Sequence, residues 1–115
     1  MRRVIVESPY AGADWSNPED RNIRYFRACM RDCVLRGETP YASHALLTQP
    51  GVLRDEVSEE RELGIQAGFA WRAVADVTVV YEDLGHSRGM KYGIKHAEGI
   101  GHPIEYRSLG GEWAQ

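Results

Sequence analysis

The sequence predicts an α/β fold, a three-layer sandwich in which helices cover both faces of a short parallel sheet of about four strands. Short β-branched runs alternate with longer segments of helical periodicity along the chain. The strand candidates are largely apolar, which is typical of parallel strands buried on both faces. The 115 residues, of which 43% are hydrophobic, suffice for a single domain spanning residues 1–115.

Four strands are expected from composition. The first is the β-branched run of residues 4–6, VIV, and a shorter second strand opens the stretch TPYASHALLTQPG, which then continues as a loop. The segment ADVTVVYED predicts a third, central strand because it is rich in valine and ends in an aromatic residue. Residues 103–106, PIEY, form the last.

Three helices are expected between these strands. Asn17 is a plausible N-cap for the first, and Gly37 a suitable stop. Ser58 is expected to cap the second, and Gly101 to close the third. The second helix has an apolar stripe that we expect to face the core or an interface. Its members are Leu63, Ala67, Ala70, Trp71 and Val74. The tail SLGGEWAQ is expected to be loose or to dock on a neighbour.

Charge and composition narrow the function classes. The formal net charge of −3 gives no broad electrostatic attraction to extended nucleic acid. No apolar run approaches the ~20 residues that span a bilayer, so we expect no membrane partner and a cytoplasmic protein. Cysteines and histidines are not spaced as metal ligands, and no metal or cofactor is expected.

Polar segments follow three of the expected strands. ESPYAG follows the first, SHALLTQ the second and EDLGHSRG the third. In parallel α/β sheets, ligands bind beyond the carboxyl ends of the strands, near a switch in strand order. We therefore expect the three segments to converge on one cleft.

The segment GHSRGMKYG is a candidate phosphate-binding loop. Gly85 and Gly89 would let the backbone approach an anion, Ser87 offers a hydroxyl, and Arg88 offers a charge. A glycine loop alone is weak evidence. The alternative is an ordinary tight turn in which Ser87 caps the following helix.

The other candidates each have a structural alternative. Tyr10 could stack on a base or sugar, with Gly12 allowing close approach, or both could belong to a simple turn. His44 could bind a ligand or act as an acid or base, or could hydrogen-bond only to backbone. Asp83 could accept hydrogen bonds from a ribose or could serve a turn.

Taken together, these segments resemble the nucleoside 2-deoxyribosyltransferase-like superfamily, which includes deoxynucleoside monophosphate N-glycosidases and a branch of small phage-associated proteins. The resemblance rests on VESPYAG, PYASHALLTQPGVLRD, SEERELGIQAG, VTVVYEDLGHSRGM and GHPIEYR, in this order. It implies a Rossmann-like fold, a nucleotide ligand and a homodimer or larger homo-oligomer. By resemblance, Tyr10 and Gly12 contact the sugar and base, Ser87 and Gly89 receive the phosphate, and Asp83 orients the sugar. With the candidates taken from the residues themselves, the expected ligand-binding residues are Ser8, Tyr10, Gly12, His44, Asp83, Gly85, Ser87, Arg88, Gly89 and Met90.

The chain departs from that pattern at one position. The resemblance implies a nucleophilic glutamate four residues after Gly89, where this chain has Gly93. Glycine has no side chain that could attack a sugar.

Two function hypotheses follow. In the first, the protein binds a nucleotide or nucleotide-derived signal without consuming it, for example a cyclic ADP-ribose-type immune signal sequestered by a phage protein in the host cytoplasm. In the second, it cleaves an N-glycosidic bond by another route. Asp83 or His44 would then be catalytic, with Asp55 and Glu59 as further candidates for activating water. A regulatory subunit with a vestigial cleft is a third, less specific alternative.

Overall fold

A four-stranded parallel sheet forms the centre of the protein. The computed structural model describes residues 1–10 and 12–114. The strands are β1 (Arg2–Glu7), β2 (Glu38–Tyr41), β3 (Val77–Tyr81) and β4 (Ile104–Arg107). They lie in the order β2-β1-β3-β4, and every neighbouring pair is parallel. The expected α/β fold and strand number are confirmed.

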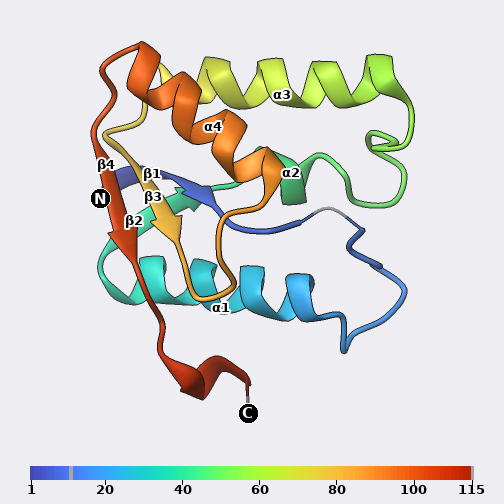
Figure 1. The fold of residues 1–115 in the computed structure, drawn as a ribbon, viewed down its shortest axis with the longest axis horizontal. Coiled ribbons are helices and arrows are strands. Elements are labelled where there is room, and N and C mark those ends of the chain that lie inside the picture. Colours follow the sequence, from blue (N-terminus) through green and yellow to red (C-terminus); the bar gives the residue numbers. More distant parts are fainter. Residues whose placement is uncertain (11, 115) are drawn as a thin grey trace.

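Helices cover both faces of the sheet (Figure 1). Helix α1 (Arg21–Leu35) lies on one face, and α3 (Ser58–Arg72) and α4 (Arg88–Gly99) lie on the other. A four-residue helix, α2 (Ser43–Leu46), occurs where the sequence predicted a loop. The described C-terminal residues form a 3-10 turn, η1 (Gly111–Ala114).

Helix α1 begins later than the sequence predicted. Asp20, rather than Asn17, is the N-cap, and its carboxylate accepts a hydrogen bond from the Ile23 backbone N–H at 3.1 Å. Asn17 instead accepts from the Glu19 backbone N–H within the preceding turn. Both residue types suit an N-cap, so composition alone could not separate the two positions.

Of the two expected places for the apolar stripe of α3, the core and an interface, the structure excludes the core for its largest members. Leu63, Trp71 and Val74 are more than half exposed, whereas Gly68 and Arg72 are buried. Ser43 of α2 packs directly against Gly68, where a Cβ atom would overlap its side chain. The close approach of α2 and the burial of a charged residue therefore decide which face of α3 turns inward.

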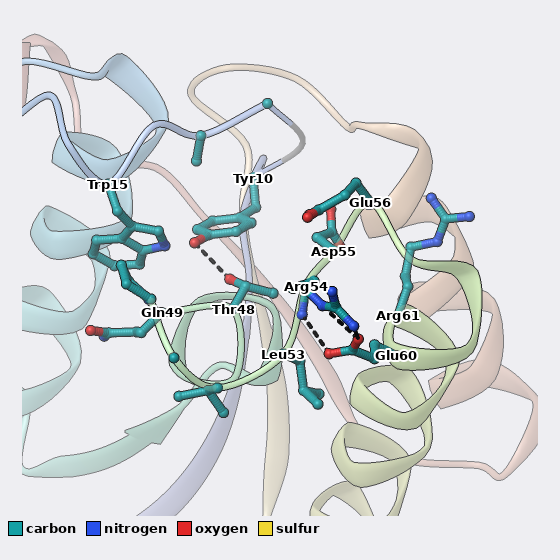
Figure 2. A pocket seen from close by; sticks show the side chains of 15 residues that line it. Tyr10, Trp15, Thr48, Gln49, Leu53, Arg54, Asp55, Glu56, Glu60 and Arg61 are labelled. Carbon is teal, nitrogen blue, oxygen red and sulfur yellow. Dashed lines mark hydrogen bonds and ion pairs between the residues drawn. The ribbon is translucent and has the colours of Figure 1, made fainter.

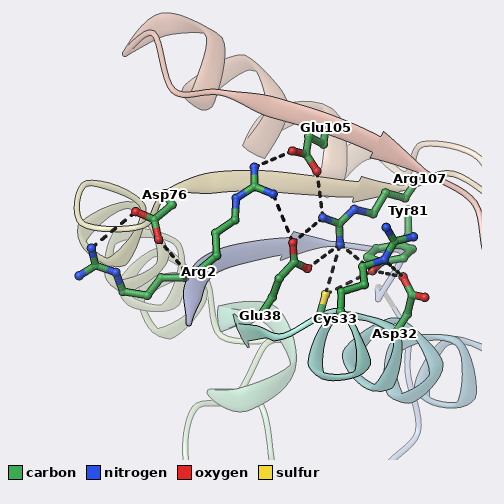
Figure 3. A network of polar contacts seen from close by, with 10 residues as sticks. Arg2, Asp32, Cys33, Glu38, Asp76, Tyr81, Glu105 and Arg107 are labelled. Carbon is green, nitrogen blue, oxygen red and sulfur yellow. Dashed lines mark hydrogen bonds and ion pairs between the residues drawn. The ribbon is translucent and has the colours of Figure 1, made fainter.

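An ionic network ties the outer strands together on the α1 face of the sheet (Figure 3). Arg107 of β4 donates to both carboxylate oxygens of Glu38 of β2, at 2.8 and 2.7 Å. Both side chains are almost fully buried. Arg2 extends the network by bonding Glu38 and Glu105. These contacts hold the sheet edges in register.

The strand order places a switch point between β1 and β3. The chain leaves β1 through α1 to reach β2 on one side, and leaves β3 through α4 to reach β4 on the other. Connections that depart in opposite directions open a crevice at the carboxyl ends of the two central strands. Within the described ranges, no helix is long and apolar enough to cross a membrane.

Candidate functional site

A cavity of about 680 Å³ lies at the carboxyl end of β1, between α2, α3 and the N-terminal half of α4. This volume lies within the range of ordinary small-molecule sites. Expected residues that line it are Ser8, Tyr10, His44, Ser87, Arg88, Gly89 and Met90. The structure therefore brings together residues from all three polar segments.

Glu7, the last residue of β1, lines this cavity, and its carboxylate lies against Gly93, which lines it too. Its Oε2 accepts a hydrogen bond from Nη2 of Arg72 at 2.5 Å, and the Glu7 side chain is only 13% exposed. Burial raises the pKa of Glu7 to about 7, although the Arg72 guanidinium opposes this effect. Arg72 also contacts Nδ1 of His96 at 3.0 Å and donates to Oγ1 of Thr78 at 3.1 Å.

Gly93 of α4 lies directly against the Glu7 carboxylate. A Cβ atom at Gly93 would come within 3 Å of the carboxyl carbon and both carboxylate oxygens. Real Cβ atoms essentially never approach other heavy atoms so closely. The space that a side chain at position 93 would enter is thus filled by a carboxylate that comes from the neighbouring strand.

Ser8 and His44 form a second polar pair in the cavity. Ser8 Oγ and His44 Nε2 share a hydrogen bond of 3.2 Å. Burial lowers the pKa of His44 to about 4, so the imidazole is neutral at physiological pH. His44 can therefore exchange hydrogen bonds with a ligand, but it brings no positive charge to the cavity.

The N-terminus of α4 forms one wall of the cavity. Ser87 is its N-cap, and Ser87 Oγ accepts a hydrogen bond from the Met90 backbone N–H at 3.2 Å. This contact is the capping role that the sequence left open as an alternative. First-turn N–H groups lack helical partners and favour anions. A Cβ atom at Gly89 would meet nothing within 4 Å, so this turn borders open space.

Cationic side chains outnumber anionic ones around the cavity. The carboxylates that line it are those of Glu7 and Asp55. The cations are Arg61, Arg72, Arg88, Lys91 and Lys95. This balance favours a ligand with negative charge, in a protein whose overall charge is negative.

Aromatic rings from α3 and α4 form another wall. Phe69 and Tyr92 line the cavity with their ring centroids 5.8 Å apart, in a stacked arrangement. Phe69 also stacks on His96, with centroids 3.5 Å apart. Tyr92 is half exposed, so part of its surface is free to contact a planar ligand group.

A second hollow of about 770 Å³ adjoins the cavity (Figure 2). The two share Tyr10, Asp55 and Arg61. Tyr10 is held between them, because its hydroxyl accepts a hydrogen bond from Thr48 Oγ1 at 2.7 Å. Gly12 and Trp15 line only the second hollow. We place the candidate site in the first, which contains the buried polar pairs.

Two expected site residues lie elsewhere. Asp83 and Gly85 line neither hollow. Asp83 accepts hydrogen bonds from the Tyr25 hydroxyl and from the Leu109 and Gly110 backbone N–H groups. Burial opposes its ionisation, but these bonds outweigh burial and lower the pKa of Asp83. Its carboxylate anchors the C-terminal segment, which argues against the expected contact with a ribose.

Comparison with known proteins assigns the chain to a family. Residues 2–107 match a protein-family model described as "Domain of unknown function (DUF7768)". The chain belongs to this family. No curated protein matches the chain significantly.

The structure is similar to that of a 2-deoxyribosyltransferase from the psychrotolerant bacterium Bacillus psychrosaccharolyticus. The TM-score is 0.63 at 19% sequence identity, over 96% of this chain and 74% of that chain. This similarity confirms the Rossmann-like fold that the sequence resemblance implied. At such low identity it concerns the fold alone.

Sequence reasoning missed the most buried charged pair of the site. Glu7 is the first residue of the ESPYAG segment and directly follows a β-branched run. This position at the end of a predicted strand could have identified it as a site residue. Arg72 stands 65 residues away near the end of a helix, where an exposed arginine is common. Only the packing of α3 on the sheet brings the two together.

Proposed function

We propose that the protein binds a nucleotide, or a nucleotide-derived signal, in the cavity at the carboxyl end of β1. The observation that carries this proposal is the meeting of a helix N-terminus, five cationic side chains and an aromatic wall around one cavity. A phosphate, a sugar and a base are the ligand parts that such groups recognise.

The phosphate is assigned to the first turn of α4. Arg88 and Lys91 supply charge beside the free N–H groups of that turn, and Gly89 leaves room for close approach. The relation to a 2-deoxyribosyltransferase fold supports this assignment, because the sequence resemblance implies a phosphate at the Ser87–Gly89 loop.

The base and sugar are assigned to the remainder of the cavity. Tyr92 and Phe69 offer ring faces for stacking, and Tyr10 also lines the cavity. Ser8 and His44 are placed to exchange hydrogen bonds with the ligand near the end of β1. This arrangement adds Phe69 and Tyr92 to Tyr10, the aromatic site residue expected from the sequence.

Sequestration and cleavage are the two forms that this function can take. Sequestration was expected because Gly93 has no side chain, and a phage-encoded protein that captures a cyclic ADP-ribose-type signal is one form of it. Cleavage of an N-glycosidic bond is a second candidate function. One observation favours it: the carboxylate of Glu7 occupies the space beside Gly93.

The first experiment is to incubate the purified protein with deoxynucleoside monophosphates, NAD, ADP-ribose and cyclic ADP-ribose isomers. The protein is then separated from free ligand and denatured, and the released compounds are identified by mass spectrometry. We expect at least one phosphorylated nucleoside to be retained. If none is retained at millimolar concentration, the proposal is wrong.

A matched pair of glycine variants locates the binding site. Gly89→Val places a side chain in the open space at the first turn of α4, so affinity should fall at least about tenfold, the equivalent of 1.4 kcal/mol. Gly99→Val makes the same change at the exposed end of the same helix and should leave affinity unchanged. Isothermal titration calorimetry measures both, and equal affinities would place the ligand elsewhere.

The expected homo-oligomer stays a prediction. Trp71 is 53% exposed and packs on Tyr41, with ring centroids 5.2 Å apart. Trp113, the other residue expected at a contact, packs on Tyr25 of its own chain instead. The α3 face around Trp71 is therefore the better candidate for contact between copies, and gel filtration tests it.

A further inference from the structure

We propose that Glu7 is the catalytic carboxylate of this site and activates water for hydrolysis of the N-glycosidic bond of a bound nucleotide. The inference rests on the proposed nucleotide binding and goes beyond it by assigning a reaction and the residue that performs it. The sequence had placed this role on Asp83 or His44. The structure offers Glu7 in their place.

The first argument is the position of the Glu7 carboxylate. It ends β1 at the switch point of the sheet, and it lines the cavity together with the first turn of α4. A nucleotide with its phosphate on that turn and its base on Phe69 or Tyr92 has its sugar between them. The carboxylate lies against Gly93, which stands one helical turn after Gly89 and next to Tyr92 on α4, so we place it beside the sugar.

The second argument concerns the two carboxylate oxygens. Oε2 is bound to Arg72, and among the described residues Oε1 has no hydrogen-bond partner of its own. Arg72 is itself fixed by Thr78 and His96, so it holds the carboxylate in one orientation. One anchored and one available oxygen is the arrangement that a positioned base requires.

The third argument is the free-energy cost of burying the ion pair of Glu7 and Arg72. A buried ion pair is often no more stabilising than apolar side chains of similar size. Here it also requires a glycine at position 93, because any side chain would overlap the carboxylate. A protein that needed only stability at this place would gain little from the arrangement. Its raised pKa additionally suits proton transfer near neutral pH.

The other carboxylates that the sequence offered are less well placed. Asp83 is bonded to the C-terminal segment and lines neither hollow. Glu59 lines neither hollow. Asp55 borders both hollows from the loop before α3 and is exposed. Glu7 is the carboxylate that combines burial, a fixed partner and access to the cavity.

The reaction balances without an added reactant other than water. Oε1 of Glu7 takes a proton from a water molecule, whose oxygen forms a bond to the anomeric carbon of the sugar. The bond between that carbon and the base nitrogen breaks, and its electron pair stays on the nitrogen, which takes a proton from solvent. Glu7 then releases its proton to solvent. The products are the free base and the sugar phosphate.

The test measures binding and turnover on the same samples. Wild type, Glu7→Gln and Glu98→Gln are incubated with the nucleotide panel, and free base is quantified by chromatography over time. Glu98 is an exposed residue on α4 outside the cavity, so its variant is the matched control. Glutamine keeps the size of Glu7 and an oxygen for Arg72, and circular dichroism checks that the variant folds.

We expect wild type and Glu98→Gln to release free base, and Glu7→Gln to release it at least about 100-fold more slowly while still binding the nucleotide. The wild-type rate should rise with pH as Glu7 loses its proton. Turnover retained in Glu7→Gln would overturn the inference. Nucleotide bound by wild type and recovered intact would also overturn it, yet would support sequestration. Absence of any binding would refute the proposed function itself.

A base-exchange assay distinguishes two roles for Glu7: a base that activates water, and a nucleophile that attacks the sugar. A second free base, added in excess, can be incorporated into a new nucleotide only if the sugar remains attached to the enzyme after the first base leaves. With Glu7 acting on water, we expect hydrolysis and no new nucleotide. Formation of the exchanged nucleotide would contradict the proposed role of Glu7 as a base.

Discussion

At the scale of single residues, the Glu7 carboxylate can lie where it does only because position 93 is a glycine. Glu7 extends from the end of β1 into space that a side chain on α4 would otherwise occupy. Arg72 prevents the carboxylate from moving aside, because it binds Oε2 and is itself bonded to Thr78 and His96. The glycine is therefore explained by a neighbour in space rather than by backbone conformation.

This interdependence predicts a specific stability pattern. Gly93→Ala should lower the free energy of unfolding by about 1–3 kcal/mol, because the added methyl group overlaps a carboxylate that cannot relax freely. Gly99→Ala, on the exposed end of the same helix, should be neutral or stabilising by up to about 1 kcal/mol. Urea denaturation measures both values.

A double variant identifies the cause. In Glu7→Ala the carboxylate is absent, so adding Gly93→Ala to that background should cost much less than it does in wild type. Equal costs in the two backgrounds would show that Gly93 is required for another reason.

At the scale of elements, Asp83 and the packing of Trp113 fasten the C-terminal segment to its own chain. Asp83 follows β3, and its two carboxylate oxygens accept bonds of 2.9 to 3.0 Å from the backbone N–H groups of Leu109 and Gly110. Trp113 of η1 then packs on Tyr25 of α1, with ring centroids 4.8 Å apart. The segment expected to be loose or to dock on a neighbour is thus fastened to its own chain.

We expect Asp83→Asn to release this segment. The amide has one acceptor oxygen and no charge, so it cannot retain both sets of backbone bonds, and stability should fall by about 2 kcal/mol. Trp113 fluorescence should shift to longer wavelength as the ring leaves Tyr25. Ligand binding in the cavity should be retained, and its loss would return Asp83 to the binding site.

At the scale of the whole molecule, two buried groups give stability opposite dependences on pH. Glu7 has a folded pKa of about 7, above the usual 4.5. The folded chain therefore holds more protons at Glu7 than the unfolded chain between these values, and stability falls as pH rises through that range. His44 has a folded pKa of about 4, below the usual 6.5, so its contribution rises with pH between those values.

Replacing Glu7 should remove its pH dependence of stability and leave that of His44. The stability of Glu7→Gln relative to wild type is expected to increase from pH 5 to pH 8, because only wild type must ionise a buried carboxyl group. The charged groups near Glu7 are Arg72 on α3 and His96 and Lys95 on α4, with His44 beyond Ser8. Wild type and Glu7→Gln have these groups in common, so the difference between their free energies of unfolding depends on Glu7. A constant difference across this range would contradict the raised pKa.

Local patterns were sufficient for most of the fold. The β-branched runs at β1 and β3 and the periodicity of α1 and α4 act over a few residues, and the structure confirms them. For α3 the sequence left the core and an interface open, and only the structure shows that Gly68 and Arg72 face inward. They do so through contacts with Ser43 and Glu7, which lie far away in the sequence. Helix α2 was missed because four residues are too short for a periodic signal.

The sequence by itself determined the α/β class, the four parallel strands and a cleft at their carboxyl ends, because hydrophobic periodicity and turn chemistry are local properties. It also predicted Tyr10, His44 and the Ser87–Gly89 loop as site residues from the segments around them, and all of them line the cavity. Only the tertiary structure decided that Asp83 anchors the C-terminal segment and that Glu7 meets Arg72 beside Gly93. Those contacts join residues 26 to 86 positions apart, and no local property of a chain specifies which distant side chains will meet.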